Sequence, residues 1–137
     1  MKVFFDTNIL VYLFDSGSPA KQSRAREVLE QHTRAGETLL STQVLQEFYV
    51  AVTRKLATPL SLDVALEALR EFAILPVIRV DTTLILSAAK FARDRQLSFW
   101  DALVVQAAME GGATRLYSED MQHGQQFDGV TIHNPFR

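Results

Sequence analysis

Short apolar segments alternate with longer segments of helical periodicity along this chain, and this alternation restricts the possible folds more than any other feature. Strand-like residues occupy five short segments, at 2–5, 38–41, 76–80, 116–117 and 130–133. Between most of them, apolar residues recur at the three- and four-residue spacing of amphipathic helices. Strands that alternate with helices predict a mainly parallel sheet covered by helices on both faces. We therefore expect a three-layer α/β/α fold.

Capping residues mark where the expected helices begin and end. Ser18, with proline at the next position, predicts one helix start, and Gly36 predicts the end of that helix. Thr7 and Asn8 can cap a short helix over residues 9–14. The remaining helix starts are expected at Thr42, Ser61, Asp81 and Ser98, with helix ends near Leu56 and Gln96 and at Gly111 and Gly112.

The length of 137 residues is that of one ordinary domain. Hydrophobic residues make up 47% and charged residues 22% of the chain, which is close to the usual globular mixture and argues against disorder. No internal repeat or long linker interrupts the sequence. We interpret residues 1–137 as a single domain.

The sequence contains no cysteine, which excludes disulfides, thiolate metal sites and cysteine nucleophiles. Any metal must then be held by oxygen or imidazole, so hard cations are the natural candidates. The apolar run at residues 9–14 is too short to span a bilayer, and the residues before it lack a signal-peptide pattern. We expect a cytoplasmic location and no membrane association.

The net charge of −2 gives no overall basic signature of nucleic-acid binding. Bound divalent ions can reverse the local sign of an acidic site, so this observation does not exclude a nucleic-acid partner. Several basic residues form local groups that either contact such a partner or are solvated helix faces. These residues are Lys21, Arg24, Arg26, Arg54, Lys55, Lys90, Arg93 and Arg95.

Two aspartates stand where a carboxylate has two possible roles. Asp6 follows the apolar run 2–5, where a buried charge needs a hydrogen-bond partner or a metal, but aspartate is also a favoured helix cap. Asp101 lies on a helix that is apolar almost all round, and its alternative role is a capping interaction with Ser98. Because the carboxyl ends of parallel strands meet at one edge of a sheet, Asp6 and residues 118–120 should face one crevice.

Three further acids and one aromatic residue have less distinctive surroundings. Glu47 lies away from the centre of the apolar stripe of its helix, so periodicity alone predicts a solvated glutamate. Glu119 and Asp120 are adjacent and cannot both point the same way, so at most one is expected as a direct ligand, and a solvated turn is the alternative. Trp100 is interpreted as a core residue in preference to an RNA-stacking platform.

Four segments, taken in order, resemble the PIN-domain nucleases. They are FDTN at residues 5–8, Glu47, FWDAL at residues 99–103 and SEDM at residues 118–121. The resemblance covers nearly the whole chain. Within that family the chain is most similar to the VapC-type toxins of bacterial toxin–antitoxin pairs. The resemblance implies an endoribonuclease that hydrolyses RNA phosphodiester bonds.

The same resemblance implies a set of site residues. The implied catalytic acids are Asp6, Glu47, Asp101 and Asp120, and the three aspartates among them are the implied ligands of Mg²⁺ or Mn²⁺. Asn8 and Ser118 match supporting polar positions. The family commonly has a basic or polar residue before the last aspartate, so Glu119 remains an alternative fourth ligand.

The resemblance also implies an RNA substrate, a cognate antitoxin protein and a homodimer. Two other classes of function stay open. One is a catalytically idle PIN-like module that binds RNA or a protein. The other is a phosphotransferase with Asp6 as nucleophile, which would need a second acid where Asn8 stands. The sequence carries no P-loop, no dinucleotide-binding glycine motif and no serine nucleophile elbow.

Overall fold

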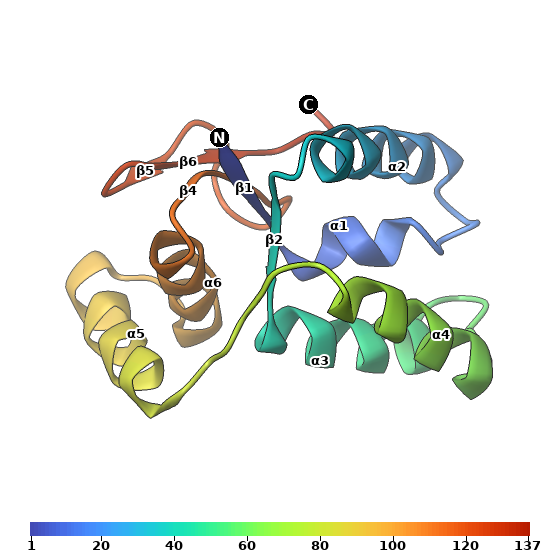
Figure 1. The fold of residues 1–137 in the computed structure, drawn as a ribbon, viewed down its shortest axis with the longest axis horizontal. Coiled ribbons are helices and arrows are strands. Elements are labelled where there is room, and N and C mark those ends of the chain that lie inside the picture. Colours follow the sequence, from blue (N-terminus) through green and yellow to red (C-terminus); the bar gives the residue numbers. More distant parts are fainter.

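A computed structural model describes all of residues 1–137 (Figure 1). The strands are β1 (Lys2–Phe5), β2 (Thr38–Ser41), β3 (Val77–Ile78), β4 (Ala113–Tyr117), β5 (Gln126–Phe127) and β6 (Val130–His133). The helices are α1 (Thr7–Tyr12), α2 (Pro19–Arg34), α3 (Thr42–Val50), α4 (Leu62–Ala73), α5 (Thr82–Arg95) and α6 (Phe99–Glu110), and a π-helical turn, η1 (Ala51–Lys55), continues α3.

The strands form one six-stranded sheet in the order β3-β2-β1-β4-β6-β5. All neighbours are parallel except β5, which runs antiparallel to β6. In the pairing of β1 with β4, Phe5 lies opposite Tyr117, so both strands end at the same edge. The next residue of the chain, Asp6, donates its backbone N–H to the Tyr117 carbonyl oxygen over 2.9 Å. The register thereby brings Asp6 next to the segment that follows β4.

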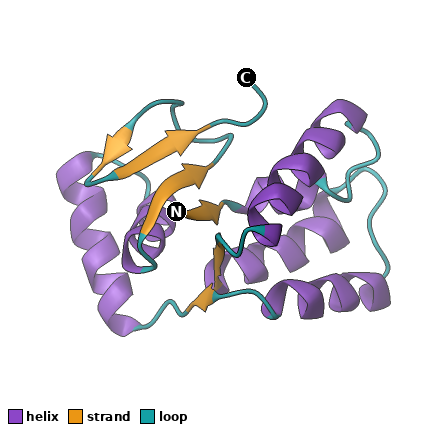
Figure 2. Ribbon diagram, turned by 45° about the horizontal axis from the view of Figure 1, so that its top comes forward, coloured by secondary structure: helices purple, strands orange, loops and turns teal.

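Helices cover both faces of the sheet, and this confirms the predicted three-layer fold (Figure 1). On one side α5 packs along α6, and α6 contacts strands β2, β4 and β6. On the other side α1 contacts α2 and α3, and α3 contacts α4. Figure 2 shows the strands between these two groups of helices.

The core joins the sheet to both helical layers. The largest fully buried side chains include Phe4 and Phe5 from β1, Leu40 from β2, Phe48 from α3 and Val105 from α6. Burying one such side chain contributes roughly 1.5–3 kcal/mol, so these contacts hold β1 and the helix starts in a fixed arrangement. None of the helices is long and apolar enough to cross a membrane.

Helix α1 begins two residues earlier than expected and α3 begins one residue earlier. Asp6, for which capping was the alternative role, is the N-cap of α1 in place of Thr7 or Asn8. Ser41, in place of Thr42, is the N-cap of α3 and accepts from the Val44 N–H over 3.3 Å. The Thr42 hydroxyl instead accepts from the backbone N–H of Val80 over 3.0 Å, because the start of α3 lies beside the segment after β3. The caps predicted at Ser61, Asp81 and Ser98 are confirmed.

The strand prediction is correct in position and less accurate in length. The strand expected over residues 76–80 is reduced to Val77–Ile78, which pairs only with the end of β2. The antiparallel strand β5 was not expected, because two residues are too few to give a periodic pattern. The helix expected through about Leu56 loses its α-helical form after Val50, where η1 begins.

Candidate active site

Asp6 lies at the carboxyl end of β1 and begins α1. One carboxylate oxygen accepts the Thr7 N–H over 2.7 Å, and the other accepts the Ser118 hydroxyl over 2.8 Å. Only 5% of Asp6 is exposed, and no basic side chain forms an ion pair with it. Asp6 therefore has the capping role, and it lies beside Ser118 at the sheet edge where the crevice was expected.

Burial raises the pKa of Asp6 from its usual value to about 7. The hydrogen bonds from Ser118 and Thr7 oppose this shift, while repulsion from Asp120 and Glu47 adds to it. An ionised carboxylate that is buried without a cationic partner is costly. A cation bound next to Asp6 would offset that cost.

Glu47 extends from α3 towards the start of α1, next to Asp6. Its Oε1 accepts the Thr7 hydroxyl over 2.7 Å, and the Gln43 amide lies 3.5 Å from its Oε2. The side chain is half-buried, so the expectation of a solvated glutamate is wrong. The physical reason is that α1 packs against α3 and covers this flank of the helix, a contact that helical periodicity does not reveal.

Asp101 lies in the first turn of α6 and is half-buried. Its backbone N–H donates to the Ser98 hydroxyl oxygen over 3.1 Å, which completes the cap of the helix. Burial raises the pKa of Asp101, a hydrogen bond with Ser98 opposes the shift, and repulsion from Asp120 and Glu47 reinforces it. The carboxylate therefore belongs to the same electrostatic cluster as Asp6.

Ser118 connects the ends of β1 and β4. Its side chain is fully buried and donates to Asp6, while its oxygen accepts the backbone N–H of Asp120 over 3.2 Å and that of Met121 over 3.4 Å. The buried hydroxyl thus holds the turn that presents Asp120. Asp120 itself is exposed at the mouth of the site.

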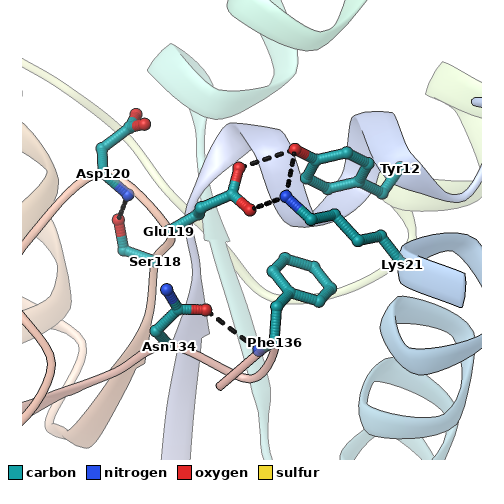
Figure 3. Close-up of polar contacts among 7 residues, drawn as sticks. All are labelled: Tyr12, Lys21, Ser118, Glu119, Asp120, Asn134 and Phe136. Atoms are coloured by element: carbon teal, nitrogen blue, oxygen red, sulfur yellow. Dashed lines mark hydrogen bonds and ion pairs between the residues drawn. The ribbon is translucent and has the colours of Figure 1, made fainter. Parts of the chain in front are cut away.

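Glu119 and Asp120 point in different directions, as expected for adjacent residues (Figure 3). One Glu119 oxygen accepts the Tyr12 hydroxyl over 2.6 Å, and the other forms an ion pair with the Lys21 ammonium group. Burial of Glu119 favours a higher pKa, but the hydrogen bonds from Lys21 and Tyr12 outweigh it and lower the pKa of the carboxyl. Glu119 is thus a compensated carboxylate, in contrast to Asp6.

A cavity of about 600 Å³ opens between α1, α3, η1 and the turn after β4. Its lining includes Asn8, Glu47, Lys55, Glu119 and Asp120, whereas Asp6 and Asp101 do not line it. The Oδ1 atom of Asn8 is buried and has no hydrogen-bond partner. An unpaired amide oxygen beside several carboxylates is a donor set suited to a hard cation.

The donor set fits an open, partly hydrated magnesium site more closely than a closed cage. No three Asp, Glu or His side chains gather tightly enough to form a ready metal site. Mg²⁺ is commonly bound through one or two carboxylates, with waters and substrate phosphates as the other ligands. The buried Asp6 carboxyl without a cationic partner and the unpaired Asn8 oxygen are compatible with such a site.

Several polar residues around the acids gave no clear signal in the sequence. Thr7 was interpreted as a cap, yet its hydroxyl orients Glu47. Gln43 is buried and donates towards Glu47 and to the Trp100 carbonyl oxygen over 3.3 Å, while its own Oε1 has no partner. These roles depend on contacts of α3 with α1 and with α6, which periodicity within one segment does not reveal.

The prediction that Trp100 is a core residue is wrong. The side chain is 62% exposed and meets Phe99 edge-on, with 5.3 Å between ring centroids. Phe99 packs against the small apolar cluster of Ala88, Ala102 and Leu103. The inner side of this turn of α6 is therefore already occupied, and Trp100 lies on the outer side.

Five of the eight basic residues singled out in the sequence fall into two groups. Lys21 and Lys55 lie at the candidate site, the first paired with Glu119 and the second lining the cavity. Others form ion pairs at the surface: Arg24 with Glu27, Arg93 with Asp94 and Arg95 with Asp128. For that second group the arrangement agrees with solvated helix faces.

Comparison with known proteins gives one family and a group of solved structures. The PIN domain family model matches residues 3–125. A search of curated proteins finds no significant relative. The fold is similar to that of VapC20 from Mycobacterium tuberculosis, described as a sarcin–ricin loop cleaving toxin, with a TM-score of 0.69 and 21% identity over 87% of this chain and 90% of that chain.

Two further structures have similar folds over nearly their whole length. A toxin–antitoxin complex from Klebsiella pneumoniae matches with a TM-score of 0.65 and 19% identity, covering 98% of each chain. A DNA-bound VapBC from Salmonella typhimurium matches with a TM-score of 0.67 and 19% identity, again covering 98% of each chain. Because the sequence identities to these structures are only 19–21%, the similarity shows a shared fold and nothing more.

Proposed function

This chain belongs to the PIN domain family, and from that membership we propose that it is a metal-dependent endoribonuclease acting as the toxin of a type II toxin–antitoxin pair. The observation that carries the proposal is the convergence of four acids from separate elements on one edge of the sheet. Asp6 and Asp101 are each repelled by Asp120 and by Glu47. Such a cluster is unfavourable in the apo protein and is suited to binding cations.

The proposed assignment divides the acids by their surroundings. Asp6, Asp101 and Asp120 are the ligands of Mg²⁺ or Mn²⁺, and Glu47, held by Thr7, completes the catalytic acids. When bound, a divalent cation supplies positive charge that neutralises the carboxylates and stabilises the charge developing on a phosphodiester. Glu47 lines the open cavity, so it is placed to accept a proton from an attacking water there.

Two supporting residues keep the acids in position. Ser118 donates to Asp6 and orients the turn that carries Asp120. Asn8 offers the unpaired Oδ1 atom as an acceptor for a water or as a ligand for the cation. An RNA strand is the substrate in this proposal, and attack by water would leave a 5′-phosphate on one fragment.

The partner in this proposal is a cognate antitoxin. The structures from K. pneumoniae and S. typhimurium are, respectively, a toxin–antitoxin complex and a DNA-bound VapBC, and this chain shares their fold. An antitoxin segment that crosses the acidic crevice would inhibit the enzyme by placing an arginine or lysine against the carboxylates. A guanidinium fork is complementary to such a site in both charge and geometry.

The proposal places the action on RNA in the cytoplasm. It also includes assembly of this chain into a homodimer. Large apolar side chains are exposed on α4, α5 and the start of α6, among them Leu62, Ile74, Leu86 and Trp100. Exposed apolar residues of this size are common where proteins associate. Light scattering of the purified chain would test the dimer independently of activity.

RNA cleavage with and without a chelator tests the proposed function. We expect fragments in the presence of Mg²⁺ or Mn²⁺, no fragments in excess chelator, and recovery when the metal is restored. RNA binding without cleavage under all conditions would instead identify a catalytically idle module. A phosphorylated Asp6 after incubation with a phosphate donor would identify a phosphotransferase.

A further inference from the structure

The Glu119 carboxylate is held by residues of the helical layer that faces the turn after β4. Tyr12 at the end of α1 donates to one oxygen over 2.6 Å, and Lys21 in the first turns of α2 pairs with the other. Lys21 also donates to the Tyr12 hydroxyl oxygen over 3.2 Å. Three polar groups from three segments therefore form one closed hydrogen-bonded unit (Figure 3).

Two aromatic rings restrain the Lys21 ammonium group. It lies 5.0 Å from the centroid of Tyr12 and 5.4 Å from that of Phe136. The two rings meet edge-on at 5.0 Å, and the Phe136 N–H donates to the Asn134 side chain over 2.9 Å. Cation–π contacts and the carboxylate together favour a single position for the lysine.

Glu119 requires such restraint because it borders the same cavity as Glu47 and Asp120, two of the proposed catalytic acids. Its side chain lines that cavity together with Asn8, Glu47 and Asp120. A free carboxylate there would add a further negative charge and a further metal donor. It would then compete for the coordination positions that waters and a substrate phosphate need.

We propose that Lys21 is a positioning residue which, together with Tyr12, holds the Glu119 carboxylate away from the acidic cluster so that Asp120 alone of the adjacent pair faces the metal. This inference rests on the proposed metal-dependent function. It assigns a role to a lysine that would otherwise count as one more surface charge. It also gives a physical reason why an acidic pair can stand in this turn.

The test measures Mn²⁺ affinity by isothermal titration calorimetry in Lys21→Met with and without Glu119→Gln. Methionine keeps an apolar stem against the rings of Tyr12 and Phe136 but removes the charge. We expect Lys21→Met to bind Mn²⁺ about fivefold more tightly, because a released Glu119 adds a charged ligand. Adding Glu119→Gln should return the dissociation constant to the wild-type value.

Three further variants separate positioning from general effects of charge and stability. Lys21→Arg should retain wild-type affinity, since it preserves the cation. Tyr12→Phe loses one hydrogen bond to Glu119 but keeps the ring, so it should increase Mn²⁺ affinity less than Lys21→Met does. Adding Glu119→Gln should remove this increase as well. Lys55→Met removes the same charge from the same cavity without touching Glu119, so Glu119→Gln should not reverse its effect.

Equal affinities of Lys21→Met and Lys21→Met/Glu119→Gln would overturn the inference, and so would weaker Mn²⁺ binding in Lys21→Met. In either case, if the wild-type protein binds Mn²⁺ and Asp120→Asn weakens that binding, the proposed function is still supported. Absence of Mn²⁺ binding by the wild-type protein would instead refute the metal-dependent function, and this inference with it.

Discussion

The Asp6 carboxyl group is buried where it accepts hydrogen bonds but has no cationic partner. The carboxylate accepts from Thr7 and Ser118 and is nearly inaccessible to water. Its position after an apolar strand predicted this burial. The repulsion from Glu47 and Asp120 could not be predicted by periodicity, because those residues come from distant segments.

Replacing Asp6 by asparagine should separate folding from catalysis. Asparagine has nearly the same volume and can still accept from Thr7, so the apo protein should unfold at the wild-type temperature or above it. Cleavage should fall by more than the roughly 10–100-fold typical of residues that only support metal ligands. Mn²⁺ should raise the melting temperature of the wild type but have a smaller effect on the variant.

Differential scanning fluorimetry and an RNA cleavage assay on the same preparations provide these measurements. Wild-type cleavage rates in a folded Asp6→Asn protein would contradict the role of Asp6.

The adjacent acids should respond differently to loss of charge. Asp120→Asn removes a proposed ligand and should lower RNA cleavage at least about tenfold. Glu119→Gln keeps a side chain that can bond to Tyr12 and Lys21, so its activity should stay within about threefold of wild type, a change of less than 1 kcal/mol in the barrier. The comparison uses initial rates at saturating Mg²⁺. A larger loss for Glu119→Gln would identify Glu119 as the fourth acid.

At the level of elements, the alternation of strands and helices predicted the layers, and the capping residues predicted most helix starts. Short-range patterns failed where tertiary contacts decide the outcome. Thr42 bonds to Val80 and leaves the cap of α3 to Ser41. Glu47 accepts a hydrogen bond from Thr7 of α1, whereas Trp100 remains exposed because Phe99 fills the inner side of the turn.

The cap of α6 should matter to both stability and activity. Ser98→Ala removes the hydroxyl that accepts from the Asp101 N–H, and loss of such a cap costs about 1 kcal/mol. Because Asp101 lies in that first turn, RNA cleavage should also decrease. Urea unfolding and cleavage rates measured together give both effects.

Ser61→Ala is the matched control, because Ser61 caps α4 through the Val64 N–H in the same way. Its loss should lower stability by a similar amount while cleavage stays at the wild-type rate. Equal loss of cleavage in both variants would show that the effect on α6 comes from general destabilisation.

At the scale of the whole molecule, the sheet brings together acids that are far apart in the sequence. Parallel pairing of β1 with β4 sets Asp6 beside Ser118, and helices α3 and α6 bring Glu47 and Asp101 to the same edge. Apolar strands could predict the sheet edge, but the order of strands and the contacts between helices are properties of the folded chain.

Expression in a bacterial host should test the proposed toxin. The unpartnered wild-type chain should arrest growth, and Asp6→Asn should be tolerated at an equal protein level. Coexpression with the protein encoded by a neighbouring small reading frame should relieve the arrest. Growth is followed by culture density, with the protein level checked in each strain. Accumulation of the wild-type protein to high levels without growth arrest or RNA cleavage would contradict the toxin assignment.

The ends of the RNA fragments provide the most direct test of hydrolysis by a metal-binding acidic cluster. The purified protein is incubated with RNA and Mg²⁺ in water enriched in ¹⁸O, with parallel samples containing chelator or Asp6→Asn, and the fragments are analysed by mass spectrometry. We predict 5′-phosphate ends that carry one ¹⁸O atom, formed only by the wild-type protein with metal. Fragments ending in 2′,3′-cyclic phosphate, or equal cleavage in chelator, would contradict the account.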